Sequence, residues 1–227
     1  MTDARPTVSA VIAVHNGSAQ IDAALASVHA QTVPVDEIIV VDDGSTDDTA
    51  GVVSRSAPRA RLLRQNRRGP AAARNVAVAA AGGELIATLD HDDTWPADRT
   101  GALLEGIGSA AYVCGRVAIE ASGNPDPRLV RADRSHIPFL LPTGLMARSA
   151  WLALDGMDEA LTRGEDIDLY LRFIEAKFEV AYVDAVTLNY RLGRHGLSRN
   201  VETSQAAMLE VLRRSVARRR LQANTTR

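Results

Sequence analysis

Residues 37–48 read EIIVVDDGSTDD, and residues 85–96 read LIATLDHDDTWP. In each stretch an apolar run of strand length ends directly in a group of aspartates. We expect both runs to be buried strands of one sheet. In an open parallel sheet, ligands bind beyond the carboxyl ends of the strands. The two acidic stretches are therefore the first candidates for a functional site.

The rest of the first half alternates in the same way. Further strands are expected at 8–14 and 61–64, and helices are expected to begin at Ser18, at Ser45 as the start of a capping box, and at Pro70. Strand–helix alternation of this kind favours right-handed crossovers. The fold class predicted is α/β, with a mostly parallel Rossmann-like sheet and helices on both faces.

The second half of the sequence is less regular. It predicts a strand at 111–120, a polar loop at 121–137, a helix at 165–177, a strand at 179–186 and a further helix from residue 202.

Composition excludes several function classes. The formal charge of −2 over 227 residues and the aromatic content of 4% argue against a nucleic-acid partner. Cys114 is the only cysteine, which excludes an internal disulfide and a cysteine-based metal site.

The sequence contains neither G-x-G-x-x-G nor a P-loop motif, so a dinucleotide site is not expected. No signal peptide or membrane-spanning stretch is recognisable, and we expect a cytoplasmic protein.

Asp90 and Asp92 are separated by one residue. On an extended chain this spacing puts both carboxylates on one face, about 7 Å apart. Carboxylate oxygens suit Mg²⁺ or Mn²⁺, which usually binds through one or two carboxylates together with water and phosphate oxygens. The alternative is that these aspartates only cap the turn at the end of a strand.

Five motifs occur in order: VSAVIAVHN at 8–16, IIVVDDGSTD at 38–47, NRRGPAAARN at 66–75, LDHDDTWP at 89–96 and GEDIDL at 164–169. A closing segment follows, with Tyr190-Arg191 and then His195 to Ser198. Together they resemble the family 2 glycosyltransferases, which have the GT-A fold. The resemblance covers residues 7–200 of the sequence.

The resemblance implies an inverting glycosyltransferase that depends on Mn²⁺ or Mg²⁺. Its donor would be a nucleoside-diphosphate sugar, with uridine as the expected base and a hexosyl or N-acetylhexosaminyl group as the sugar. Its acceptor would be a hydroxyl of a glycan, lipid, peptide or small molecule. Residues 1–110 would form the nucleotide-sugar-binding half, residues 111–200 the acceptor-binding half of the same domain, and residues 201–227 a basic C-terminal helix.

The family's donor-binding positions correspond to Ala13, His15, Asp43, Arg74, Asp90 and His91. By this resemblance, Asp43 accepts a hydrogen bond from the nucleobase, and Arg74 neutralises the diphosphate. His91 is included for its place between two aspartates, although on an extended chain its side chain would point to the opposite face.

The metal-binding positions implied by the resemblance are Asp92, as the direct ligand, and His195. A surface histidine is the alternative for His195.

Asp166 is the candidate catalytic base, with Glu165 orienting it or binding the acceptor. Both lie in the first turn of an expected helix, where the helix dipole favours the anion, so we expect an ionised base at neutral pH. Simple stabilisation of the helix N-terminus is the alternative. Asp168 is expected to pair with Arg172 on the helix surface.

Two other functions fit parts of the sequence. One is a non-catalytic nucleotide-sugar-binding protein of the same fold. The other is a haloacid-dehalogenase-type phosphatase, because residues 90–94 match D-x-D-x-T. That class needs a lysine before its later acidic motif, whereas Lys177, the only lysine, follows Asp166.

The C-terminal segment is rich in arginine, and its expected helix places Met208, Leu212 and Val216 opposite the arginines. Solvated arginines or a packed homodimer are the first interpretations. Contact with anionic lipid is the weaker one, and it would place the protein at the inner face of the membrane.

Overall fold

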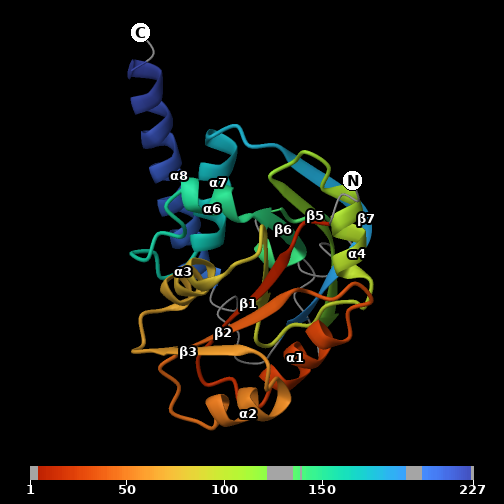
Figure 1. Cartoon of the computed structure of the whole chain (residues 1–227). Coiled ribbons are helices and arrows are strands. Elements are labelled where there is room, and N and C mark those ends of the chain that lie inside the picture. Colours follow the sequence, from red (N-terminus) through yellow and green to blue (C-terminus); the bar gives the residue numbers. More distant parts are fainter. Residues whose placement is uncertain (1–4, 122–134, 139, 193–200, 226–227) are drawn as a thin grey trace.

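A computed structural model describes residues 5–121, 135–138, 140–192 and 201–225. Seven strands form one sheet in the order β3-β2-β1-β4-β6-β5-β7 (Figure 1). The strands are β1 (Val8–Val14), β2 (Glu37–Asp43), β3 (Arg61–Gln65), β4 (Leu85–Asp90), β5 (Tyr112–Ala121), β6 (Gly144–Ala147) and β7 (Val180–Leu192). Strands from both halves of the sequence share this sheet, while the boundaries near residues 110 and 200 stay predictions.

The helices lie on both faces of the sheet (Figure 1). They are α1 (Ile21–His29), α2 (Thr49–Ser56), α3 (Pro70–Ala80), α4 (Arg99–Gly106), α6 (Arg148–Ala153), α7 (Glu165–Glu175) and α8 (Val201–Thr225), with a 3₁₀ turn η1 (Leu141–Thr143). None of the helices in the described part of the chain is both long and apolar enough to cross a bilayer.

Alternation along the central strand explains the two layers of helices. In β1, Ile12 packs in a core with α1 and α2, while the neighbouring Val11 packs in a second core with α3. Both side chains are almost fully buried. A strand that is apolar on both faces needs a helix layer on each, which is what the continuous apolar run predicts.

The sheet is mostly parallel, as expected. Strands β1 to β4 are parallel to one another and β5 is parallel to β7, whereas β6 runs antiparallel to both β4 and β5. The order of the strands reverses beside β1, which has β2 on one side and β4 on the other. Ala13 pairs with Asp90 across this point, and Val14 pairs with Asp42. The two acidic strand ends therefore lie on either side of the end of β1.

Two helix starts differ from the sequence-based expectation. Helix α1 begins at Ile21 without a side-chain cap, and α2 begins at Thr49 rather than near Ser45. The backbone N–H of Ser45 donates to Asp42 Oδ1, and its hydroxyl accepts from the backbone N–H of Asn16. Ser45 therefore fastens the loop after β2 to the loop after β1 and does not cap a helix.

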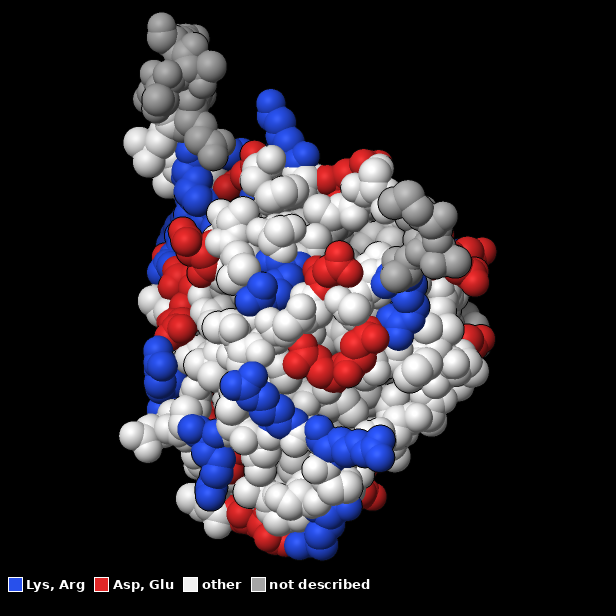
Figure 2. Space-filling view, in the orientation of Figure 1, with Lys and Arg blue, Asp and Glu red and all other residues white. Residues whose placement is uncertain are grey.

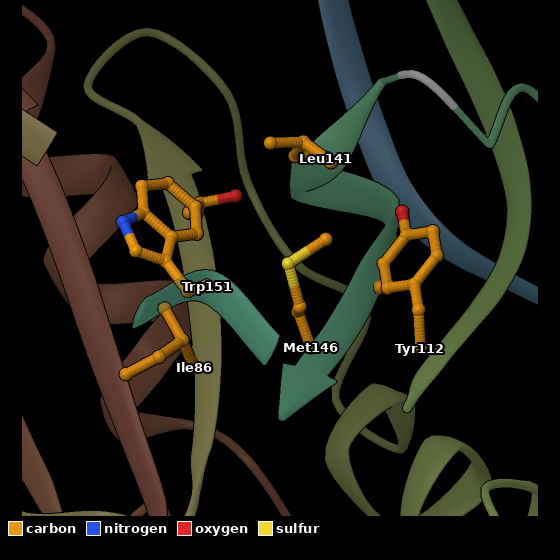
Figure 3. A pocket seen from close by; sticks show the side chains of 7 residues that line it. Ile86, Tyr112, Leu141, Met146 and Trp151 are labelled. Carbon is orange, nitrogen blue, oxygen red and sulfur yellow. The ribbon is translucent and has the colours of Figure 1, made fainter. Parts of the chain in front are cut away.

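A small cavity lies between β4, β6, η1 and α6. Ile86, Tyr112, Leu141, Met146 and Trp151 line it, together with Thr88 and Gly144. Figure 3 shows Met146 between Trp151 and Tyr112. No acidic strand end contributes to this lining, so the cavity belongs to the core and is distinct from the acidic strand ends.

Candidate active site

The acidic stretch after β4 forms a turn. Asp90 is the last residue of the strand, and its carbonyl accepts a hydrogen bond from the backbone N–H of Asp93 at 3.1 Å. The extended geometry expected for residues 90–92 is therefore wrong, because the chain turns between Asp90 and Asp93. Burial raises the pKa of Asp92, and the negative charge of Asp90 adds to this rise. The two carboxylates thus remain electrostatic neighbours despite the turn.

Asp93 is a member of this turn that sequence reasoning missed. Its side chain is 1% exposed, and burial and the charge of Asp90 raise its pKa to about 9, so it is neutral at pH 7. Its Oδ1 accepts a hydrogen bond from the backbone N–H of Arg191 at 2.8 Å. Thr94 forms a bridge with Asn189 directly beside it. Asp93 therefore connects the acidic turn to Arg191 near the end of β7, which belongs to the first part of the closing segment.

Arg74 lies at the centre of the candidate site. Its side chain is buried in α3, and it donates to Asp90 Oδ1 at 2.6 Å and to Glu165 Oε1 at 3.1 Å. Its Nη1 also lies 3.5 Å from Asp166 Oδ1. Burial opposes the charged form, but the three carboxylates outweigh it and keep the pKa of Arg74 above its ordinary value. Arg74 therefore joins the end of β4 to the first turn of α7.

The pKa of Asp166 is higher than the sequence-based expectation of an ionised base implies. Burial raises its pKa to about 7; Arg74 works against this rise, whereas Glu165 and Asp90 add to it. The expectation of an ionised base considered the helix N-terminus and left out burial beside two other acids, which favours the protonated form. Oδ1 of Asp166 accepts no hydrogen bond from the described residues. The side chain is therefore half-protonated near pH 7, and its Oδ1 has only the ion-pair contact with Arg74 at 3.5 Å.

The ends of β1 and β2 form the other side of the site. His15 Nδ1 lies 2.9 Å from the carbonyl oxygen of Asp43. The carboxylate of Asp43 accepts hydrogen bonds from the backbone N–H groups of Arg68 and Gly69 and from Gln65 Nε2. Asp43 thus holds the loop before α3 against β2. Its contact with a nucleobase stays a prediction.

His91 has a packing role. A Cβ at Gly17 would lie 2.6 Å from the His91 ring, so the ring fits against the backbone of the loop after β1 because residue 17 has no side chain. His195 lies outside the described residues. Its role as a metal ligand stays a prediction.

The carboxylate oxygens of Asp90 and Asp92 are suitable ligands for a divalent cation that also binds phosphate. Nowhere in the described ranges do three or more His, Cys, Asp or Glu side chains form a group that could hold a metal ion. Asp90 and Asp92 supply one or two carboxylates, which is the usual protein contribution to a Mg²⁺ site that phosphates and waters complete. Figure 2 shows acidic side chains gathered in the middle of one face, with basic side chains around them.

Behind α7 lies a charged network that the sequence only partly predicts. Asp168 pairs with Arg172 at 2.7 Å as expected, yet it is 1% exposed and not on the surface. It also accepts from Arg218 Nη1 at 2.9 Å, and Arg218 Nε donates to Glu175 at 2.7 Å. Helix α8 is thereby fixed to the helix that carries Glu165 and Asp166.

Comparison with known proteins identifies relatives of the chain. The family model described as "Glycosyl transferase family 2" matches residues 9–157. A succinoglycan biosynthesis protein, ExoU of Rhizobium meliloti (strain 1021), is 35% identical over 86% of this chain and 67% of its own. The chondroitin synthase of Pasteurella multocida (strain Pm70) is 28% identical over 95% of this chain, which spans only 24% of that protein.

Solved structures show the same fold. S. aureus TarS 1–349 in complex with UDP superimposes with a TM-score of 0.67, at 21% identity, over 82% of this chain and 61% of that one. The complex of TarS 1–349 with UDP-GlcNAc gives 0.69 at 19% identity, over 90% and 65% of the two chains. These similarities confirm the predicted GT-A fold.

Proposed function

The chain belongs to glycosyl transferase family 2, and on that basis we propose that it transfers a sugar from a uridine-diphosphate donor to an acceptor hydroxyl with inversion at the anomeric carbon. The observation that carries the proposal is the position of Arg74, which bonds Asp90 at the end of β4 and Glu165 at the start of α7. The same guanidinium lies 3.5 Å from the candidate base Asp166, so the strand end proposed to bind the donor and the proposed base both contact Arg74. The bound UDP and UDP-GlcNAc of the TarS structures favour uridine.

The donor would lie across the ends of β1, β2 and β4. Ala13 and His15 would border the base and ribose, since Ala13 pairs with Asp90 near the end of β1 and His15, just after β1, contacts Asp43. The guanidinium of Arg74 would contact the diphosphate and offset its negative charge. Asp92 would hold Mn²⁺ or Mg²⁺ directly, with Asp90 as the neighbouring carboxylate. The bound cation would stabilise the negative charge of the leaving diphosphate.

Asp166 would act as the general base. The acceptor oxygen attacks the anomeric carbon from the face opposite the diphosphate, its proton passes to a carboxylate oxygen of Asp166, and the bond between sugar and phosphate breaks with its electrons on the departing diphosphate. Glu165 would hold Arg74 in place by its bond at 3.1 Å. The half-protonated state of Asp166 near neutral pH matches what a base needs in order to take and then release a proton.

Asp166→Asn tests the proposal. We expect transfer with UDP-sugars and Mn²⁺ to fall by about 10²-fold or more, while the affinity for UDP changes little, because the base contacts the acceptor and not the nucleotide. Isothermal calorimetry and a product assay measure the two quantities. Asp155→Asn is the matched control, because Asp155 is exposed and its left-handed backbone suits asparagine.

Two results would overturn the proposal. Substantial transfer by Asp166→Asn would refute the assignment of the base. Tight binding of UDP by the unsubstituted protein, with no turnover of any sugar donor, would show a binding protein of this fold.

A further inference from the structure

Helix α8 has two faces, and they differ in whether their arginines form ion pairs with the rest of the protein. On the inner face Val211 and Ser215 are buried. Arg214 pairs with Asp158 at 2.6 Å, and Arg218 pairs with Asp168 and Glu175. These two arginines are therefore engaged with the body of the protein. They are not available to a partner.

The outer face is apolar and uncovered. Leu209, Leu212 and Val216 are 55%, 42% and 39% exposed, and with Arg213, Ala217 and Arg220 they line a shallow groove along the helix. Of the seven large hydrophobic side chains that are exposed in the described part of the chain, four lie on α8. This concentration on one helix distinguishes the face from the scattered apolar residues of an ordinary surface.

The charges beside this stripe have one sign. Arg213, Arg219 and Arg220 are exposed, and no ion pair holds any of them within the described residues. Between residues 205 and 221 the only acid is Glu210, which pairs with Arg214. The stripe expected from the sequence was Met208, Leu212 and Val216, facing away from the arginines. In the structure Arg213 and Arg220 flank the stripe directly.

We propose that the outer face of α8 binds the surface of an anionic lipid bilayer. An apolar stripe bordered by arginines is the pattern of a helix that lies in the membrane interface, with leucines inserted and guanidinium groups at the phosphates. A second copy of this chain fits less well, because the stripe of each copy would bring arginines against arginines. Figure 1 shows α8 extending beyond the body of the protein, where a flat surface can reach it. The proposal does not depend on the proposed catalytic function.

Vesicle binding by the full chain tests the proposal. We expect co-sedimentation with phosphatidylglycerol–phosphatidylcholine vesicles and little binding to phosphatidylcholine alone. Each arginine near an anionic surface contributes a factor of about five, so Arg213→Glu with Arg220→Glu should weaken binding at least about 25-fold. The matched control is Arg55→Glu with Arg59→Glu, two exposed arginines near α2, at the opposite end of the molecule (Figure 1).

A second variant, Leu209→Ser with Leu212→Ser, probes the apolar stripe and should also weaken binding, with the helix content by circular dichroism unchanged. Truncation at Arg218 is avoided because it would remove the ion pairs to α7. Three results would overturn the proposal: no binding to anionic vesicles, equal loss in the α2 control, or binding of soluble polyphosphate as tight as that of vesicles. A dimer in solution that the serine variant separates would assign the stripe to a second copy instead.

Discussion

Asp166 lies in an environment that sets the pH range in which it can accept a proton. Burial and the neighbouring acids raise its pKa to about 7. A base works in its ionised form, so activity is present above this pH and is lost as the pH falls through it. We expect kcat/KM to fall about tenfold per pH unit below the inflection, since this ratio reports the pKa of the free enzyme. A pH profile at saturating Mn²⁺ measures it.

Glu165→Gln provides the internal check on this profile. Glu165 raises the pKa of Asp166, so removing its charge should move the inflection to lower pH. The residual rate of Asp166→Asn should have no inflection near 7. An inflection that is the same in all three proteins would assign the titration to another group.

Sequence analysis predicted most of the individual residues that lie together in the candidate site. Asp90, Glu165 and Asp166 were each predicted, and all three lie within 3.5 Å of Arg74. The sequence could not show which of these acidic side chains are buried, and therefore how their pKa values shift. Burial raises the pKa of Asp93, while the hydrogen bond from the backbone N–H of Arg191, 98 residues away, lowers it. Contacts of that separation leave no local pattern.

Helix α8 is joined by ion pairs to α7, the helix that begins with Glu165 and Asp166. Arg218 donates to Asp168 and Glu175, whose carboxylates are almost completely buried. Replacing Arg218 with methionine keeps the apolar stem and leaves Glu175 without its guanidinium partner. We expect the free energy of unfolding to fall by about 2 kcal/mol, as measured by urea denaturation.

The neighbouring Arg219 supplies the control for this variant. It is exposed and has no ion pair among the described residues, so Arg219→Met should change the free energy of unfolding by less than about 0.5 kcal/mol. Equal effects of the two substitutions would mean that the Arg218 network contributes no more than a solvated arginine.

Individual elements were predicted to different degrees. The strands with continuous apolar runs, such as β1 and β4, begin and end within a residue of the prediction. Strand β7 extends to Leu192, six residues beyond the end expected at Val186. Its pairing with β5 shifts register between Tyr182 and Leu188 before it continues to Leu192, and polar side chains there interrupt the alternation that sequence reasoning relies on.

The fold of the whole molecule brings the loops of the candidate site together at the point where the strand order reverses. The ends of β1, β2 and β4 meet there because Ala13 pairs with Asp90 and Val14 with Asp42. Arg74 then connects this point to α7 in the second half of the chain. The strand-end rule predicts the location from sequence alone. The connection through Arg74 emerges only when both halves fold on one sheet.

A ligand that joins these parts should stabilise the whole protein and not a single loop. At a UDP concentration about 100 times its dissociation constant, with Mn²⁺ present, binding to the folded state contributes about 2.7 kcal/mol. For a protein of this size we therefore expect the midpoint of thermal unfolding to rise by about 5–10 °C. Addition of EDTA, or the substitution Asp92→Ala, should remove most of this rise, because Asp92 would be the direct ligand of the metal. Scanning calorimetry measures the shift. A rise that persists in EDTA would show that UDP binds without the metal, and no rise in the unsubstituted protein would contradict a uridine donor.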